Sequence, residues 1–182
     1  MTFAGYTPAE KRTRTTFLAL MWSLSYPGRS FQLSAEQAPF ELIAETLLDL
    51  ETTYCLSEKT TIHHAAQSGA RMLPPERAAY HFYEQVTEQD LKSLAQASVG
   101  TMPFPDEGAT LILGGGIDSG ARFELTGPGV NGSIQVQIDR IPSEFWILRE
   151  RACQFPLGWD IFIVDERRVI GLPRSVKMKR TG

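Results

Sequence analysis

In the first half of the chain, segments whose apolar residues recur at helical spacing alternate with segments whose pattern is typical of strands. Thr7, Pro8 and Glu10 predict a helix start, because Thr7 can cap the first turn and Glu10 can complete a capping box. This helix must end before Pro27, since a proline disfavours the helical conformation of the residue before it. The same periodicity predicts helices over 39–50, 60–67 and 87–98, and strands over 30–33, 52–56 and 78–83.

Strand-like patterns are concentrated in the second half of the chain. Residues 109–113 form a continuous apolar run, which is typical of a strand covered on both faces. The remaining pattern predicts strands over 122–126, 133–138, 161–164 and 169–172, a charged turn over 165–168, and a helix that begins at Pro142. The whole pattern predicts one α/β domain over residues 1–182, with a mixed sheet flanked by helices.

Composition narrows the class of protein. The 182 residues carry a net charge of −3, which argues against a nucleic-acid-binding protein, and we interpret the basic C-terminal tail as a solvated end. The two cysteines, Cys55 and Cys153, are too few for a disulfide framework. The N-terminal segment lacks the apolar run of a signal peptide, and no run is long enough to span a membrane. We therefore expect a cytoplasmic protein that binds neither nucleic acid nor membrane.

Two glycine-rich segments resemble nucleotide-binding loops in composition. Residues 127–132 match G-x-G-x-x-G, but an alternating strand-like segment follows where the dinucleotide motif requires a helix. Residues 114–120 lack the Gly-Lys-Ser/Thr ending of a phosphate-binding loop. We interpret the first segment as a turn and the second as a flexible hairpin connection.

The sequence shows no complete metal or catalytic set, and the catalytic residues stay unknown. His63 and His64 are adjacent, so they do not share a helix face, and no suitably spaced ligand completes a metal site. Asp160 fits a buried structural carboxylate better than an acid–base group. Arg174 could present its guanidinium to a phosphate or carboxylate, or serve as an ordinary surface or interface arginine.

Several segments together resemble the PhnH family, the H subunit of the carbon–phosphorus lyase system. The resemblance covers about residues 17–176 and is strongest at the end of the chain, where Phe155-Pro156-Leu157-Gly158 precedes Asp160 and where Leu172-Pro173-Arg174 follows. The other matching segments are Phe17 to Ser25 with Pro27-Gly28, Leu47-Leu48-Asp49 with Glu51-Thr52, Gly100-Thr101 with Pro105, Gly108 to Leu113, and Leu125 to Gly129. The family usually has an arginine where this chain has Leu18, so an anion contact by that arginine is not expected here.

The resemblance implies a fold similar to the large domain of transferases that depend on pyridoxal phosphate, but without that cofactor. It also implies a homodimer that joins the G, I and J subunits in a cytoplasmic complex. That complex attaches an alkylphosphonate to the ribose of ATP, forming ribose 1-phosphonate 5-triphosphate. On this basis Ser25, Pro27, Gly28, Asp160 and Arg174 are candidates for ligand binding or subunit docking.

Three classes of function remain open at this point. The first is an assembly subunit of that complex. The second is a free-standing small transferase that uses Arg174, Asp160 and Ser25. The third is a binding module for a phosphonate or a nucleotide. The lack of a phosphate loop, a metal set or a nucleophile–base pair favours the assembly subunit. We expect no cofactor and no metal.

Overall fold

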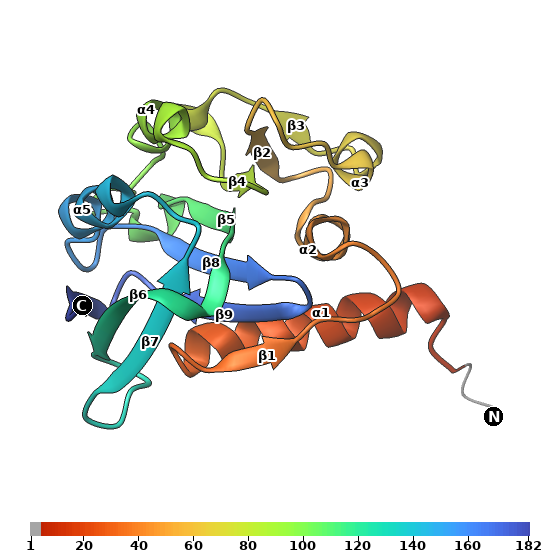
Figure 1. Cartoon of the computed structure of the whole chain (residues 1–182). Helices are drawn as coiled ribbons and strands as arrows, with labels where there is room; N and C mark the ends of the chain where they lie inside the picture. The colour runs from red at the N-terminus through yellow and green to blue at the C-terminus, as the bar shows by residue number, and fades with distance from the viewer. Residues whose placement is uncertain (1–4) are drawn as a thin grey trace.

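The computed structural model describes residues 5–182 and has a mixed seven-stranded sheet at its centre (Figure 1). The strand order is β1-β9-β8-β5-β4-β2-β3, and β3, β2, β4, β5 and β8 run parallel. The hairpin partner β9 pairs antiparallel with β8, and the edge strand β1 pairs antiparallel with β9, so only β9 runs against the other strands of this sheet. The strands of this sheet are β1 (Ser30–Gln32), β2 (Thr53–Leu56), β3 (Arg71–Met72), β4 (Tyr80–Tyr83), β5 (Thr110–Gly114), β8 (Asp160–Asp165) and β9 (Arg168–Leu172).

A second, three-stranded antiparallel sheet lies beside the first, in the order β10-β6-β7. Its strands are β6 (Gly116–Thr126), β7 (Ile134–Asp139) and β10 (Lys177–Arg180). The helices are α1 (Pro8–Ser25), α2 (Pro39–Leu47), α3 (His63–Gln67), α4 (Leu91–Leu94) and α5 (Ser143–Ala152), with single 3₁₀ turns at Pro75–Arg77, Glu88–Asp90 and Pro105–Glu107. Within residues 5–182, no helix is both long and apolar enough to cross a membrane.

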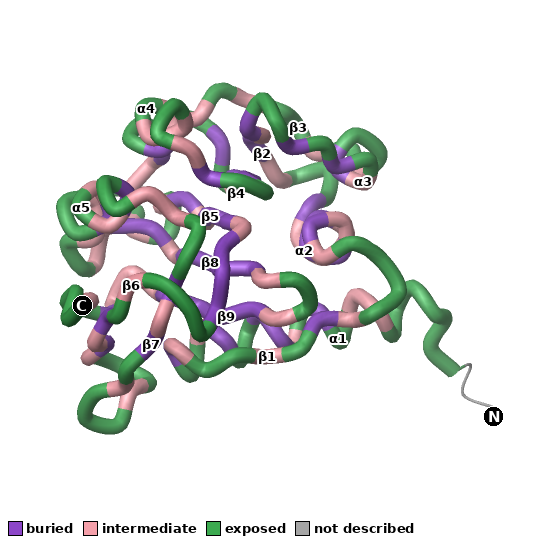
Figure 2. Tube along the Cα trace, in the orientation of Figure 1, coloured by how far each residue is buried: buried purple, intermediate pink, exposed green. Residues whose placement is uncertain are grey.

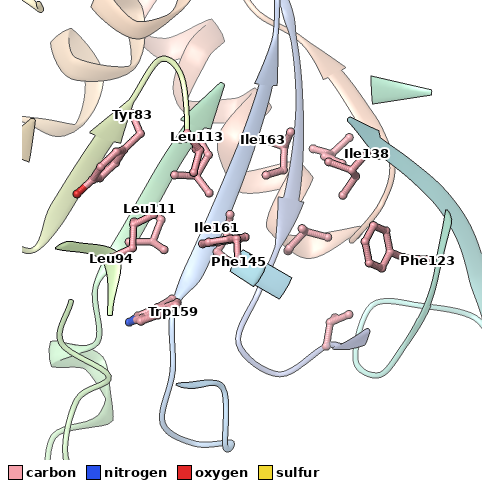
Figure 3. Packing of buried hydrophobic residues seen from close by; sticks show 14 of the residues in the cluster. Tyr83, Leu94, Leu111, Leu113, Phe123, Ile138, Phe145, Trp159, Ile161 and Ile163 are labelled. Atoms are coloured by element: carbon pink, nitrogen blue, oxygen red, sulfur yellow. The ribbon is translucent and has the colours of Figure 1, made fainter. Parts of the chain in front are cut away.

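The two faces of the large sheet have separate hydrophobic cores, because successive side chains of a strand point to opposite faces. Leu111, Ile161 and Ile163 pack with α4, α5 and the small sheet (Figure 3). Ile112 and Phe162, from the same two strands, pack instead with α1, α2 and α3. Figure 2 shows the central strands as buried. The prediction of a mixed α/β fold with helices around the sheet is confirmed.

Helix α1 packs on β9 through small and polar side chains rather than through its largest ones. Its buried positions are Thr16, Ala19, Leu20 and Ser23. Gly171 of β9 allows this close approach, because an added Cβ would lie 2.5 Å from the backbone carbon of Ser23. Leu20 is buried, but the large side chains of Phe17, Met21 and Trp22 remain exposed, as does that of Tyr26 directly after the helix.

Several predicted boundaries are wrong, each for a local reason. Helix α2 ends at Leu47 rather than at position 50, since Asp49 turns the chain by accepting the backbone N–H groups of Glu51 and Thr52. The predicted helix over 87–98 is only a 3₁₀ turn followed by the short α4. Residues 114–120 do not form a flexible connection, because β6 begins at Gly116 and continues through an irregularity between Ile117 and Ala121.

The basic C-terminal tail is not a free end. Residues 177–180 form β10, which pairs antiparallel with residues 123–126 of β6. Alternation along β10 turns Met178 toward the hydrophobic core, while Lys177 and Lys179 are exposed. The segment 127–132 is a turn between β6 and β7, as predicted.

Candidate functional site

Asp160 and Arg174 meet at the end of the β8–β9 hairpin where β8 begins. Register pairs Ile161 with Leu172, so Asp160 and the segment after β9 leave the sheet side by side. The Arg174 backbone N–H donates to Asp160 Oδ1 at 2.9 Å, and Arg174 Nη2 and Nε donate to Oδ2 at 2.8 and 3.2 Å. Only 14% of the Arg174 side chain and 25% of the Asp160 side chain are exposed. The two candidates therefore form one enclosed ion pair.

The same guanidinium holds the loop before β5. Arg174 Nη1 donates to the carbonyl oxygen of Pro105, and Nη2 reaches the carbonyl oxygen of Gly108 at 3.4 Å. Position 108 accepts only glycine, because a Cβ there would lie 2.4 Å from the Gly158 carbonyl oxygen and 2.6 Å from Arg174 Nη1. Arg174 thus connects β8 to a loop about seventy positions earlier in the chain.

The turn before β8 completes this cluster. Gly158 has φ +136°, a conformation that L side chains rarely adopt, and its N–H donates to the Val99 carbonyl at 2.9 Å. Trp159 is buried, and its indole N–H donates to the carbonyl of Ala97 at 3.2 Å (Figure 3). Cys153 lies against Gly158 and accepts the Trp159 N–H at 3.5 Å, which is a packing role. We call Asp160, Arg174, Gly108, Gly158 and Trp159 the hairpin cluster.

The other three candidate residues lie elsewhere, at the end of α1. Ser25 donates its hydroxyl to the Met21 carbonyl. Its own carbonyl oxygen and Pro27 face the β6–β7 turn, where a Cβ on Gly129 would lie 2.5 Å from the Ser25 oxygen. Gly28 has φ +78° and donates its N–H to the Gly171 carbonyl at 3.4 Å. The structure therefore pairs Asp160 with Arg174, while Ser25, Pro27 and Gly28 pack the helix exit against the small sheet.

Arg149, on α5, is the residue that sequence reasoning missed. It is 3% exposed, and its Nη2 donates to the carbonyl oxygens of Pro173 and Val176 at 3.1 and 3.2 Å. Its Nε is buried and has no hydrogen-bond partner among residues 5–182. Burial lowers the pKa of the Arg149 guanidinium, yet arginine remains charged in proteins. In the sequence Arg149 is one of three charged residues at 149–151, so no pattern distinguishes it from its exposed neighbours.

A second aspartate–arginine network lies at the opposite end of β8. Asp165 accepts the Ile117 N–H at 3.0 Å and pairs with Arg140 at 2.6 Å and Arg168 at 3.1 Å. Arg168 also pairs with Asp118 at 2.5 Å. We call Asp165, Arg140, Arg168 and Asp118 the turn network. Its arginines are more open than Arg174, with side chains 62% and 33% exposed.

The histidines do not form a metal site. Among residues 5–182, no group of three or more His, Cys, Asp or Glu side chains could hold a metal ion. His63 pairs with Glu41 at 3.1 Å, and the Glu41 carboxylate also accepts the backbone N–H groups of His63 and His64. Glu41 therefore anchors the start of α3 to α2.

Comparison with known proteins identifies the family to which these features belong. Residues 4–179 match the family described as bacterial phosphonate metabolism protein PhnH. The chain belongs to the PhnH family. The resemblance that the sequence suggested is confirmed. Some of the segments that suggested it contribute to the hairpin cluster, namely Pro105 with Gly108, residues 155–158 with Asp160, and residues 172–174.

Two relatives of known description are similar over most of this chain. A putative C–P lyase subunit, HtxG, from Stutzerimonas stutzeri is 29% identical over 175 residues, which cover 94% of this chain and 88% of that protein. Subunit PhnH of alpha-D-ribose 1-methylphosphonate 5-triphosphate synthase from Rhizobium meliloti (strain 1021) is 26% identical over 183 residues, covering 92% of this chain and 90% of that protein. Both relatives are named as subunits of a larger enzyme.

Proposed function

We propose that this chain is a subunit of a carbon–phosphorus lyase complex and that it supports the synthesis of ribose 1-methylphosphonate 5-triphosphate from ATP and an alkylphosphonate. Membership of the PhnH family over nearly the whole chain is the observation that carries the proposal. The two similar proteins, named as a C–P lyase subunit and a synthase subunit, support it. The partners we expect are the G, I and J subunits, in the cytoplasm.

The hairpin cluster supports an assembly role over independent catalysis. A free-standing transferase would need a nucleophile, a base and a charge-stabilising group that converge on an open site. Here Asp160 and Arg174 are occupied by each other and by the carbonyl oxygens of Pro105 and Gly108. Ser25 already donates its hydroxyl within its own helix. We therefore propose that the isolated chain turns over neither ATP nor methylphosphonate.

The fold-level part of the proposal is that residues 1–182 act as one domain, akin to the large domain of pyridoxal-phosphate-dependent transferases but without the cofactor. Schiff-base chemistry requires a lysine whose pKa is lowered, usually by burial. All five lysines are exposed, namely Lys11, Lys59, Lys92, Lys177 and Lys179. A stoichiometric aldimine band after mixing the protein with pyridoxal phosphate would contradict this part.

We propose that the exposed row on α1 forms the homodimer contact. The row consists of Phe17, Met21, Trp22 and Tyr26, and the rings of Trp22 and Tyr26 are stacked with centroids 5.6 Å apart. A two-fold axis places the same surface of each copy against the other. An uncharged row suits such a contact, because it brings no like charges together. Leu18, where the family usually has an arginine, adds no charge to it. Trp159 is buried and Trp146 packs on Phe123, so Trp22 is the tryptophan that stands available for the contact.

The complex itself provides the main test of function. The G, I and J subunits are co-expressed with and without this chain, and adenine release from ATP in the presence of methylphosphonate is measured. We expect release only when this chain is present and co-purifies with the others. Release at the full rate by the isolated chain would favour the transferase, and release at the full rate without the chain would exclude a role in synthesis.

Light scattering after gel filtration tests the dimer contact. The double variant Phe17→Ser/Trp22→Ser is expected to convert a dimer into a monomer at micromolar concentration. Phe104→Ser is the matched control, because Phe104 is an equally exposed aromatic residue (57%, against 50% for Phe17) in the loop before β5. A wild-type monomer, or a double variant that remains dimeric, would contradict the proposed contact.

A further inference from the structure

A large cavity lies between α5 and the small sheet, and it shares Arg174 with the hairpin cluster. Its volume is about 1000 Å³, and it is bounded by residues of α5, of the end of β6, and of the segment from Arg174 to Arg180. This volume is at the upper end of the range usual for small-molecule sites. Nothing in the proposed assembly role requires such a cavity.

The cavity borders on the buried Arg149. This guanidinium forms no ion pair with a carboxylate of residues 5–182, and its Nη2 donates hydrogen bonds to the carbonyl oxygens of Pro173 and Val176. Its buried Nε has no partner among the same residues. Removing a charge from water without a counter-ion is unfavourable, so an arginine in this position calls for an anion.

The internal carboxylate of Asp160 does not meet that need. It acts electrostatically on Arg149, but its oxygens accept hydrogen bonds from Arg174. The residues that border the cavity include five cationic and two acidic ones. Among the cationic ones, Lys177 and Lys179 lie on the other face of β10 from Met178, and Arg174 is paired with Asp160. Arg149 and Arg180 remain, and their two guanidinium groups match a dianion.

Part of the cavity lining is apolar and aromatic. Phe123 and Trp146 pack against each other with ring centroids 4.8 Å apart, and Ile147 and Met178 lie beside the same space. Arg180 lies two positions after Met178 on β10, so both side chains project from the same face of the small sheet. Phe123 is the register partner of Arg180. The site thus combines an apolar surface with a charged end, as ligand pockets commonly do.

We propose that this cavity binds an organic phosphate or phosphonate, with the phosphorus oxyanion toward Arg149 and Arg180 and the organic part against Trp146. A phosphate or phosphonate group carries close to two negative charges near neutral pH, and the two guanidinium groups of Arg149 and Arg180 balance that charge. Guanidinium groups bind such oxyanions strongly through charge-assisted hydrogen bonds. The class of ligand follows from the cavity, whereas the choice of ATP and methylphosphonate as specific probes rests on the proposed function.

Arg149 also holds the turn at 173–176 through its two carbonyl contacts, and a purely structural role would need no ligand. The test therefore measures binding directly. Inorganic phosphate, methylphosphonate and ATP are titrated into the full chain by calorimetry and by tryptophan fluorescence in a Trp22→Phe background, in which Trp146 and the buried Trp159 remain. A further Trp146→Phe change shows which part of the signal comes from Trp146. Binding by at least one of the three is expected in the millimolar range or tighter.

Arg149→Met should weaken that binding by about 10- to 100-fold, since it removes a buried charged donor. Arg149→Lys keeps the charge and should retain much of the affinity. Arg180→Gln, at an exposed position that the fold does not need, should weaken binding a few-fold. Lys92→Gln, on α4 and outside the cavity lining, is the matched control and should change nothing. If Arg149→Met does not fold, Arg180→Gln and the Trp146 signal decide the question.

Three results would overturn the site. The first is that the wild-type chain binds none of the probes. The second is that binding is unchanged in both Arg149→Met and Arg180→Gln. The third is that only an acidic segment of a partner subunit fills the cavity in the complex. Binding of inorganic phosphate that depends on Arg149 supports the site even if ATP and methylphosphonate fail. Assembly with the partner subunits is scored separately by co-purification, so loss of binding with intact assembly leaves the proposed function standing.

Discussion

The two ends of β8 carry the same chemical pairing in different surroundings. At one end, Asp160 and Arg174 are enclosed, with side chains 25% and 14% exposed. At the other end, Asp165 is 16% exposed, but the side chains of its partners Arg140 and Arg168 are 62% and 33% exposed. The hairpin cluster also engages backbone carbonyls of a distant loop, whereas the turn network is built mainly around the tip of one hairpin.

The two ends of β8 differ in how far solvent reaches their arginines, and an ion pair contributes most to stability when its charges have lost access to water. An enclosed charge that loses its partner cannot be resolvated, so breaking such a pair costs several kcal/mol. An exposed pair exchanges protein contacts for water contacts and contributes little. The hairpin cluster should therefore be sensitive to substitution, and the turn network tolerant.

The largest effect is expected from Asp160→Asn. It leaves the Arg174 guanidinium enclosed without a counter-ion and next to the buried Arg149, so we expect a loss of about 3 kcal/mol in the free energy of unfolding. Urea denaturation measures the loss. Combining it with Arg174→Met should recover part of the stability, because the unpaired charge is then gone. A single variant as stable as the wild type would show that solvent reaches this pair.

His81 is the limiting case of an enclosed group, because it has no charged partner within the described part of the chain, residues 5–182. Burial lowers its pKa to about 4, against the effect of its hydrogen bond to the Ala78 carbonyl. The unfolded chain, with a histidine pKa of about 6.5, binds the proton more readily. Stability is therefore full above pH 6.5 and falls by about 3 kcal/mol as the pH drops to 4.

Denaturation curves between pH 4 and pH 7 measure this loss. The variant His81→Gln should be less stable near pH 7 but should lose much of the pH dependence, since glutamine does not titrate. His63→Gln is the control, because the His63 side chain is 83% exposed. An equal pH slope in wild type and His81→Gln would exclude His81 as the cause.

Asp165→Asn should have a smaller effect, about 1.5 kcal/mol. Burial opposes ionisation of Asp165, but the hydrogen bonds from the Ile117 N–H and from Arg168, with the charge of Arg140, hold its pKa below the usual value. Since the folded pKa is lowered, this contribution is present above the unfolded pKa near 4 and is lost as the pH falls through the folded value. Thermal unfolding at pH 7 and pH 3 should show the variant approaching the wild type at the lower pH. A constant difference at both pH values would contradict the assignment.

Asp118→Asn should have the smallest effect, within about 0.5 kcal/mol. The Asp118 side chain is 75% exposed, and asparagine tolerates its positive φ of 71°. Its thermal midpoint is expected to match the wild type at physiological salt. A loss as large as that of Asp160→Asn would mean that exposure does not separate the two ends of β8.

The sequence allowed most of the fold to be predicted, but less of the site. Thr7 and Glu10 form the predicted capping box at the start of α1, and the strands on either side of residues 165–168 pair as predicted. Asp160 and Arg174 were both selected as candidates, but their direct pairing was not foreseen, because it depends on the register of β8 against β9. Arg149 could not be found at all, since its charge gives no local sign that it will be buried.

The sequence by itself determined the features that depend on neighbouring residues. These include helix starts set by side-chain caps and turns set by glycine and proline, because their hydrogen bonds close within a few positions. The positions of many strands also follow from local apolar patterns, although their pairing partners do not. Only the tertiary structure decided that the basic tail is β10, that Arg149 is buried beside a cavity, and that the largest side chains of α1 remain exposed. These depend on which surfaces meet across the fold. α1 approaches β9 through Ala19, Ser23 and Gly171, so close contact, and not side-chain size, selects the buried face.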